Sequence, residues 1–202
     1  MNFIKRLIFG FTFILLASVA SAKELKSDQL NYVVTVPDTW TVKSQDQTGF
    51  YVTSQDGKRS VDLAIVPAPF ANFDSNYITK YEQILKKVHN LQLVSSKVFT
   101  IDGAPAYENI QRLGTVSIAS VKVEHQIFAD GRLYGLDTLV IGGDATQDSD
   151  LQEALNSFHF LHTPKPSGSF GFGGFGSLGV KLAIIGIIIA GIVFWAIQRR
   201  KI

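Results

Sequence analysis

The chain has 202 residues, of which 46% are hydrophobic and 18% are charged, and its mean hydropathy is positive at +0.18. This composition excludes disorder for most of the chain and is typical of one globular domain joined to additional apolar segments. The chain has no cysteine. Disulfide bonds, thiolate nucleophiles and cysteine-ligated zinc or iron–sulfur centres are therefore excluded.

The formal net charge of +2 hides an acidic central part, because basic residues gather at the two ends of the chain. Residues 23–164 contain 12 Lys and Arg against 17 Asp and Glu, which is a net charge of −5. Nucleic-acid affinity comes from many cationic contacts with phosphate groups. We therefore expect no nucleic-acid partner.

Residues 1–22 have the features of a secretory signal peptide. A cationic start precedes an apolar run, and the segment ends in the small residues Ala20-Ser21-Ala22. An uncleaved N-terminal anchor is the alternative, but the apolar run over residues 7–20 is shorter than the roughly 20 residues of a spanning helix. We expect cleavage before Lys23 and export of the mature chain.

Residues 23–163 are predicted to form one globular domain around an antiparallel sheet of about seven strands. Apolar residues alternate with polar ones in short runs, and turn signals separate the runs. The strongest of these signals are Asp56-Gly57, Asp102-Gly103 and Asp130-Gly131. Strands are expected over residues 32–36, 49–54, 59–67, 93–101, 104–113, 116–129 and 132–141.

Two helices are expected within this domain. The first covers residues 76–89, and its apolar residues fall on one stripe that packs on the sheet. The residues of this stripe are Tyr77, Ile78, Tyr81, Ile84, Leu85 and Val88. The second helix begins with Ser149, whose spacing to Gln152 predicts a capping box. Its residues that face the core are Leu151, Leu155 and Phe158.

The order of these pieces resembles the PsbP-like superfamily over residues 30–161. The motifs that carry the resemblance are Val36-Pro37-Asp38-Thr39-Trp40, residues 101–107, residues 130–136 and Leu155-Asn156-Ser157-Phe158. The resemblance implies an α/β (α+β) fold. In this fold, an α/β/α sandwich, helices cover both faces of a central antiparallel sheet.

Members of this superfamily include an extrinsic subunit of photosystem II, a Ran-binding nuclear import factor and many bacterial envelope proteins. They share the binding of partners rather than a reaction, so the resemblance implies a non-catalytic domain that acts through protein partners. Fold alone does not determine function. The C-terminal segments described below are not part of the superfamily fold, and nothing in the sequence indicates photosynthesis.

The sequence contains no nucleophile elbow, zincin helix, P-loop or EF-hand motif, and we predict no catalytic residue, metal or cofactor. His125 lies on the apolar face of a strand and is expected to be a hydrogen-bonded core histidine. His159 and His162 are expected to be partly exposed imidazoles rather than a metal pair. The alternative function is a periplasmic hydrolase or metal-dependent enzyme. An open pocket in which His125 lies beside a carboxylate would favour it.

An acidic group surrounds the start of the second helix and comprises Asp144, Asp148, Asp150 and Glu153. We expect a solvated loop whose carboxylates favour the positive end of the helix dipole. A weakly held hard cation is the alternative interpretation.

The connection before the first helix is rich in aromatic residues. Phe70, Phe73 and Tyr77 are expected either to fold under this helix or to form an exposed apolar patch that a partner covers.

Residues 164–179 are rich in Gly, Phe and Ser and are predicted to form a flexible tether. Gly171, Gly173 and Gly176 match the spacing of the dinucleotide fingerprint, but no strand precedes them. We therefore interpret the segment as a linker. Together with the apolar and basic segments that follow, it resembles the GlyGly-CTERM class of bacterial sorting signals, which rhomboid-like proteases cut. A surface-exposed or released protein is thus an alternative.

Residues 180–198 are predicted to form a single transmembrane helix, since residues 182–197 contain no charge. Trp195 lies where an interfacial aromatic residue is expected, and the basic tail 199–202 follows. The positive-inside rule places this tail in the cytoplasm. The sequence therefore predicts a single-pass protein of the bacterial inner membrane whose globular domain is periplasmic. The superfamily resemblance implies that this domain binds or assembles protein partners.

The membrane helix has one side made of small residues. Gly179, Ala183, Gly186 and Ala190 lie at positions i, i+4, i+7 and i+11. Helices associate in membranes by close packing at such residues. The side is a candidate face for weak self-association or for a partner helix, and a plain anchor is the alternative.

Overall fold

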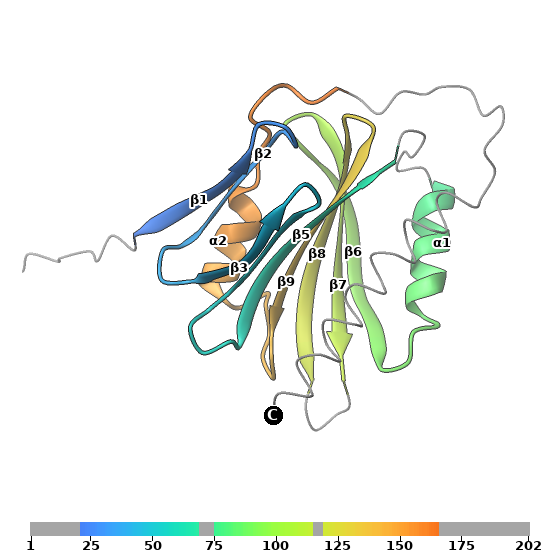
Figure 1. Cartoon of the computed structure of the whole chain (residues 1–202). Coiled ribbons are helices and arrows are strands. Elements are labelled where there is room, and N and C mark those ends of the chain that lie inside the picture. Colours follow the sequence, from blue (N-terminus) through green and yellow to red (C-terminus); the bar gives the residue numbers. More distant parts are fainter. Residues whose placement is uncertain (1–20, 69–74, 115–118, 166–202) are drawn as a thin grey trace, which may run out of the picture.

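The computed structural model describes residues 21–68, 75–114 and 119–165 (Figure 1). Seven strands form an antiparallel sheet in the order β3-β4-β5-β9-β8-β7-β6, as predicted in number and direction. Six of them coincide with predicted strands, whereas the strand predicted over residues 32–36 pairs in a separate sheet instead. The seven strands are β3 (Thr41–Asp46), β4 (Gly49–Thr53), β5 (Arg59–Pro67), β6 (Leu91–Ile101), β7 (Ala104–Leu113), β8 (Ser120–Ala129) and β9 (Arg132–Val140). A separate two-stranded sheet contains β1 (Ala22–Ser27) and β2 (Tyr32–Pro37).

Two-residue turns join the central strands, as the Asp-Gly signals predict. Asp102 and Gly103 have φ of 50° and 80°, and Asp130 and Gly131 have φ of 54° and 68°. Positive φ at both central residues matches the right-handed twist of the flanking strands. The turns therefore set the register of β6 with β7 and of β8 with β9.

The helices α1 (Ser75–Leu85) and α2 (Ser149–Ser157) pack on opposite faces of the seven-stranded sheet (Figure 1). Successive side chains of a strand point to opposite faces. Ile127 accordingly belongs to the core under α2 and the β1–β2 pair, whereas Phe128 belongs to the core under α1. The fold is therefore an α/β sandwich with a helix on each face, and α1 lies against β6 while α2 lies against β2, β5 and β9.

Four details of the structure differ from the sequence-based predictions. β1 and β3 are not among the predicted strands, and β3 is exposed along its whole length. The first helix ends at Leu85 rather than at residue 89, because the chain turns there to enter β6. The capping residue of α2 is Asp148, whose Oδ1 accepts the N–H of Leu151 at 3.3 Å. Ser149 is instead the first residue of the helix.

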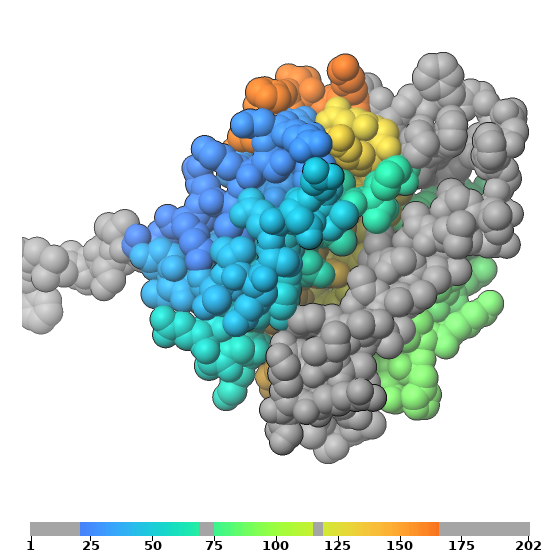
Figure 2. Space-filling model, viewed as in Figure 1, coloured from blue at the N-terminus to red at the C-terminus, as the bar shows by residue number. Residues whose placement is uncertain are grey.

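The last described residues return to the β1–β2 pair after α2. In the space-filling view, residues 158–165 lie next to the turn that joins β1 and β2 (Figure 2). Among the described residues, no helix has the length and apolar character needed to cross a membrane. The predicted transmembrane helix, tether and basic tail lie outside the described residues except for Pro164 and Lys165, as does the signal peptide except for its last two residues.

Candidate functional site

A row of polar residues crosses the sheet on the face that carries α1. Residues that are directly paired on neighbouring strands place their side chains on the same face. From β4 to β6, the members of the row are Tyr51, Asp62, Asp137, Glu124, Asn109 and Ser96. Three of them are carboxylates, and Lys122 extends from β8 toward two of these. We call Asp62, Lys122, Glu124 and Asp137 the buried charge cluster.

Glu124 is the centre of this cluster, and its side chain is only 1% exposed. Its carboxylate accepts hydrogen bonds from Tyr81 Oη at 2.7 Å, Gln111 Nε2 at 2.8 Å and Gln126 Nε2 at 2.7 Å. Gln126 in turn accepts the hydroxyl of Tyr77 at 2.8 Å. Two tyrosines of α1 thus reach polar groups of β8, which satisfies hydroxyls that burial would otherwise leave unpaired.

Lys122 supplies the positive charge of the cluster. Its Nζ lies 2.9 Å from Asp137 Oδ1 and 3.7 Å from Glu124 Oε2. Burial alone would lower the pKa of the ammonium, but the charges of Asp137 and Glu124 outweigh burial and raise it. Lys122 therefore stays charged. Burial would likewise raise the pKa of Glu124, but the charge of Lys122 and the hydrogen bonds of Gln126 and Tyr81 lower it.

The two aspartates of the cluster behave differently from Glu124. Burial raises the pKa of Asp137 to about 7, against the opposing charge of Lys122. Burial also raises the pKa of the half-buried Asp62 to about 6, again with Lys122 opposing. Asp62 and Asp137 are cross-strand neighbours on β5 and β9. The cluster consequently takes up protons as the pH falls through neutrality, while Glu124 and Lys122 keep their charges.

We expect the Asp62→Asn variant to be more stable than the wild type at neutral and alkaline pH. The folded-state pKa is raised from 3.8 to about 6, so ionisation of Asp62 favours the unfolded chain above pH 4. The gain should grow from about pH 4 to pH 6 and then level off at roughly 1 to 2 kcal/mol. This gain in the free energy of unfolding is measured by urea titrations of the full chain in mild detergent, with circular dichroism as the signal.

Asp56→Asn is the matched control, because the hydrogen bond from Ser54 lowers the pKa of this exposed carboxylate instead. Its ionised form stabilises the folded state above the unfolded pKa, so its loss cannot stabilise the protein at any pH. Equal responses of the two variants at pH 8 would contradict the raised pKa of Asp62.

The buried charge cluster helps to hold α1 against the sheet. Burial raises the pKa of the Tyr81 hydroxyl well above its ordinary value, so this group remains a proton donor toward Glu124. The rings of Tyr77 and Tyr81 are stacked with centroids 6.1 Å apart, and an edge of Phe128 packs on Tyr77. Polar and aromatic contacts therefore hold the same face of α1.

His125 lies on the other face of β8 and is 5% exposed. Its Nε2 lies 3.0 Å from Glu108 Oε2, and the ring of Phe99 packs against the imidazole with centroids 5.0 Å apart. Lys97 Nζ approaches the second oxygen of Glu108 at 3.0 Å. The hydrogen bond to His125 lowers the pKa of Glu108 against the effect of burial. The prediction of a packed, hydrogen-bonded core histidine is confirmed.

The remaining candidate ligands are dispersed. His159 and His162 are both exposed, and in the described parts of the chain no three His, Asp or Glu side chains are arranged so that they could hold a metal ion. Asp148 caps α2 and lies 2.6 Å from the Nε of Arg59, which confirms that a carboxylate stabilises the helix N-terminus. Asp144 accepts the N–H and hydroxyl of Thr146 within its own loop.

Two predicted interaction surfaces fall largely outside the described residues. Tyr77 is 7% exposed and faces Gln126 on the sheet, so its own side chain is not part of an exposed patch. Phe70 and Phe73 lie outside the described residues, and the patch stays a prediction for them. The helix face comprising Gly179, Ala183, Gly186 and Ala190 also lies outside them.

The buried charge cluster is the feature that the sequence analysis missed. Lys122, Glu124 and Gln126 alternate with apolar residues, a pattern typical of a strand with one solvated face. The sequence does contain one signal for the cluster, which is the presence of two tyrosines in the apolar stripe of the first helix. A buried tyrosine hydroxyl needs a polar partner, so these residues indicate polar groups on the sheet beneath the helix.

Comparisons with known proteins identify the fold. No protein-family model and no curated protein sequence matches the chain. The solution structure of cyanobacterial PsbP (CyanoP) from Synechocystis sp. PCC 6803 is similar, with a TM-score of 0.52 and 15% identity over 70% of this chain and 94% of that chain. The domain has a PsbP-like fold. A crystal structure of LpqN, involved in cell envelope biogenesis of Mycobacterium tuberculosis, matches this PsbP-like domain with a TM-score of 0.46 and 10% identity, over 69% of this chain and 90% of that chain.

Proposed function

We propose that the protein is a non-catalytic binding or assembly module with a PsbP-like fold, held at the outer face of the bacterial inner membrane. The signal peptide at residues 1–22 would export the chain, and the helix at residues 180–198 would retain it in the membrane. The PsbP-like superfamily, whose members share the binding of partners, supports action through protein contacts.

We favour binding over catalysis because the buried charged groups are paired with other groups of the same domain. Glu124 is bonded to three side chains of the domain, and Lys122 is paired with Asp137 and Glu124. His125 is packed between Glu108 and Phe99. A general acid or base must come within hydrogen-bond reach of a substrate. The most perturbed groups of this domain instead hold its own elements together.

Reporter fusions test the topology. A reporter that is active only outside the cytoplasm should be active when fused after Pro164 and inactive when fused after Ile202. This result follows from the positive-inside orientation of a single span before the basic tail. The reverse pattern would contradict the proposed orientation, and activity of both fusions would contradict a span between the two positions.

Cell fractionation separates retention from sorting. A protein that is anchored intact keeps a C-terminal epitope tag and an epitope inside the domain in the same membrane fraction. If the tether and helix are a sorting signal, the domain epitope will appear on the surface or in the medium without the C-terminal tag. That outcome would contradict the proposed membrane anchor and would favour a surface-exposed or released protein.

A further inference from the structure

Residues 158–165, which we call the exit segment, are held by side chains of three turns. The N–H of Phe160 donates to Asp102 Oδ2 at 2.8 Å. The N–H of His162 donates to Asn31 Oδ1 at 2.7 Å, and the N–H of Lys165 donates to Asp130 Oδ1 at 2.8 Å. These acceptors come from the β1–β2, β6–β7 and β8–β9 turns, which lie at one end of the sheet that we call the turn end (Figure 1).

The contacts between the exit segment and these turns are reciprocal. Asn31 Nδ2 donates to the carbonyl of His162 at 3.0 Å and to Asp130 Oδ2 at 2.9 Å. The N–H of Asp130 donates to the carbonyl of Lys165 at 3.0 Å. Asn31 and Asp130 have left-handed backbones, with φ of 55° and 54°. Asn and Asp are among the few residues that adopt this conformation readily.

Apolar packing strengthens the same attachment. Phe158 and Phe160 are 3% and 7% exposed, and the ring of Phe160 meets that of Tyr134 edge-on with centroids 5.3 Å apart. Between them, His159 exchanges two backbone hydrogen bonds with Val33, of 3.0 and 3.1 Å. The chain consequently leaves the domain at the turn end, after Lys165, and not at the end of α2.

We propose that this attachment makes the turn end the membrane-facing end of the domain. The inference rests on the membrane anchor of the proposed function. A linker with the composition of residues 166–179 has a root-mean-square length of about 20 Å. β5, with nine residues, spans about 30 Å of the sheet. Because the linker is shorter than the sheet, the end from which it departs stays nearer to the bilayer, and partners reach the opposite end.

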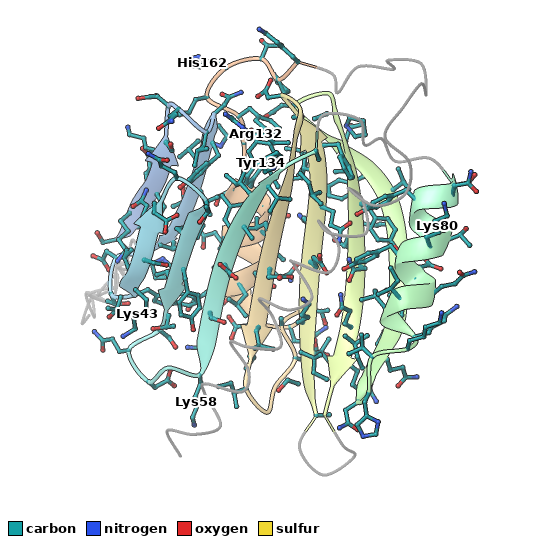
Figure 3. The ribbon with its side chains drawn as sticks, turned by 45° about the vertical axis from the view of Figure 1, so that its right-hand side comes forward. Lys43, Lys58, Lys80, Arg132, Tyr134 and His162 are labelled. Atoms are coloured by element: carbon teal, nitrogen blue, oxygen red, sulfur yellow. The ribbon has the colours of Figure 1, made fainter. Side chains whose placement is uncertain are left out.

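Two exposed positions mark the two ends. Gln29 lies at the turn end, where its carbonyl accepts a hydrogen bond from Arg132. Lys58 precedes β5 at the opposite end, and Figure 3 shows it far from His162 of the exit segment. Since the chain has no cysteine, Gln29→Cys and Lys58→Cys each create a single labelling site.

Energy transfer to lipid tests the orientation. The full chain, carrying a donor fluorophore at one of these cysteines, is reconstituted into vesicles of phosphatidylcholine and phosphatidylglycerol that contain an acceptor-labelled lipid. We expect transfer from position 29 to be several-fold larger than transfer from position 58. Equal transfer from both positions in vesicles that float with the protein would overturn the inference alone. Failure of the protein to float with the vesicles would overturn the anchor, and the inference with it.

A double variant tests the role of the turn side chains. Asn31→Gly with Asp130→Gly keeps positive φ accessible and removes two of the three side chains that hold the exit segment, leaving Asp102 in place. The difference in transfer between positions 29 and 58 should shrink, and the amides of His162 and Lys165 should exchange about tenfold faster. Asn90→Gly is the matched control, since Asn90 has φ of 61° in the turn before β6. Unchanged exchange and transfer in the double variant would overturn the role of these side chains.

Discussion

The Lys122→Met variant should lose about 3 to 5 kcal/mol of stability at pH 8. This substitution keeps much of the side-chain volume and removes the ammonium that lies within 4 Å of Asp137 and Glu124. Two buried carboxylates then lack their countercharge. Loss of one partner from a buried ion pair costs more than the pair contributes, because the remaining charge is desolvated.

The loss should be smaller at pH 5 than at pH 8. Asp137 and Asp62 have folded-state pKa values of about 7 and about 6, so both hold protons in the folded protein at pH 5. Removal of Lys122 raises both values further, since its charge opposes the effect of burial. Stability should therefore fall more steeply with rising pH than in the wild type. Lys43→Met, an exposed position on β3, is the control, and an equally small loss in both variants would contradict the buried ion pair.

The Gly49→Ala variant should be destabilised by roughly 3 kcal/mol. Gly49 begins β4 with φ of 131°, where a side chain is strained. A Cβ atom at this position would lie 1.7 Å from the carbonyl oxygen of Leu63 on β5. That oxygen belongs to the backbone of a central strand, so relief requires the two strands to separate.

Gly57→Ala is the control for backbone strain without a steric clash. Gly57 has φ of 68°, and nothing lies within 4 Å of its Cβ position. We expect a loss of about 1 kcal/mol from the left-handed backbone alone. Urea titrations of both variants measure the difference, and a Gly49→Ala loss no larger than that of Gly57→Ala would contradict the close approach of β4 and β5.

Much of the sheet was predictable because its signals are local. The Asp-Gly turns at residues 102–103 and 130–131 require positive φ, and the runs beside them alternate with period two. β3 lacks such a signal, since it is an edge strand that is exposed along its length and has no buried face. A strand without a buried face leaves no hydrophobic pattern in the sequence.

The buried charge cluster could not be derived from the sequence, because its burial depends on long-range packing. Glu124 becomes buried when α1, 43 residues earlier at Tyr81, packs over β8. Asp62 and Asp137 become neighbours through the pairing of β5 with β9, which joins strands distant in the sequence. Local alternation shows which residues share a face, but it does not show what covers that face.

Photocrosslinking in the cell envelope tests the central claim, that the domain acts by binding a protein partner. A photoreactive amino acid is placed in the full chain at exposed apolar positions of the described residues, which a partner would cover. These positions are Val42, Val94, Val98 and Ile141, and the exposed polar turn residue Gln29, at the turn end, is the control. We predict a discrete light-dependent adduct with one protein at a subset of the apolar positions and none at Gln29. No protein adduct at any of these positions, or the same adducts at all of them, would contradict the claim.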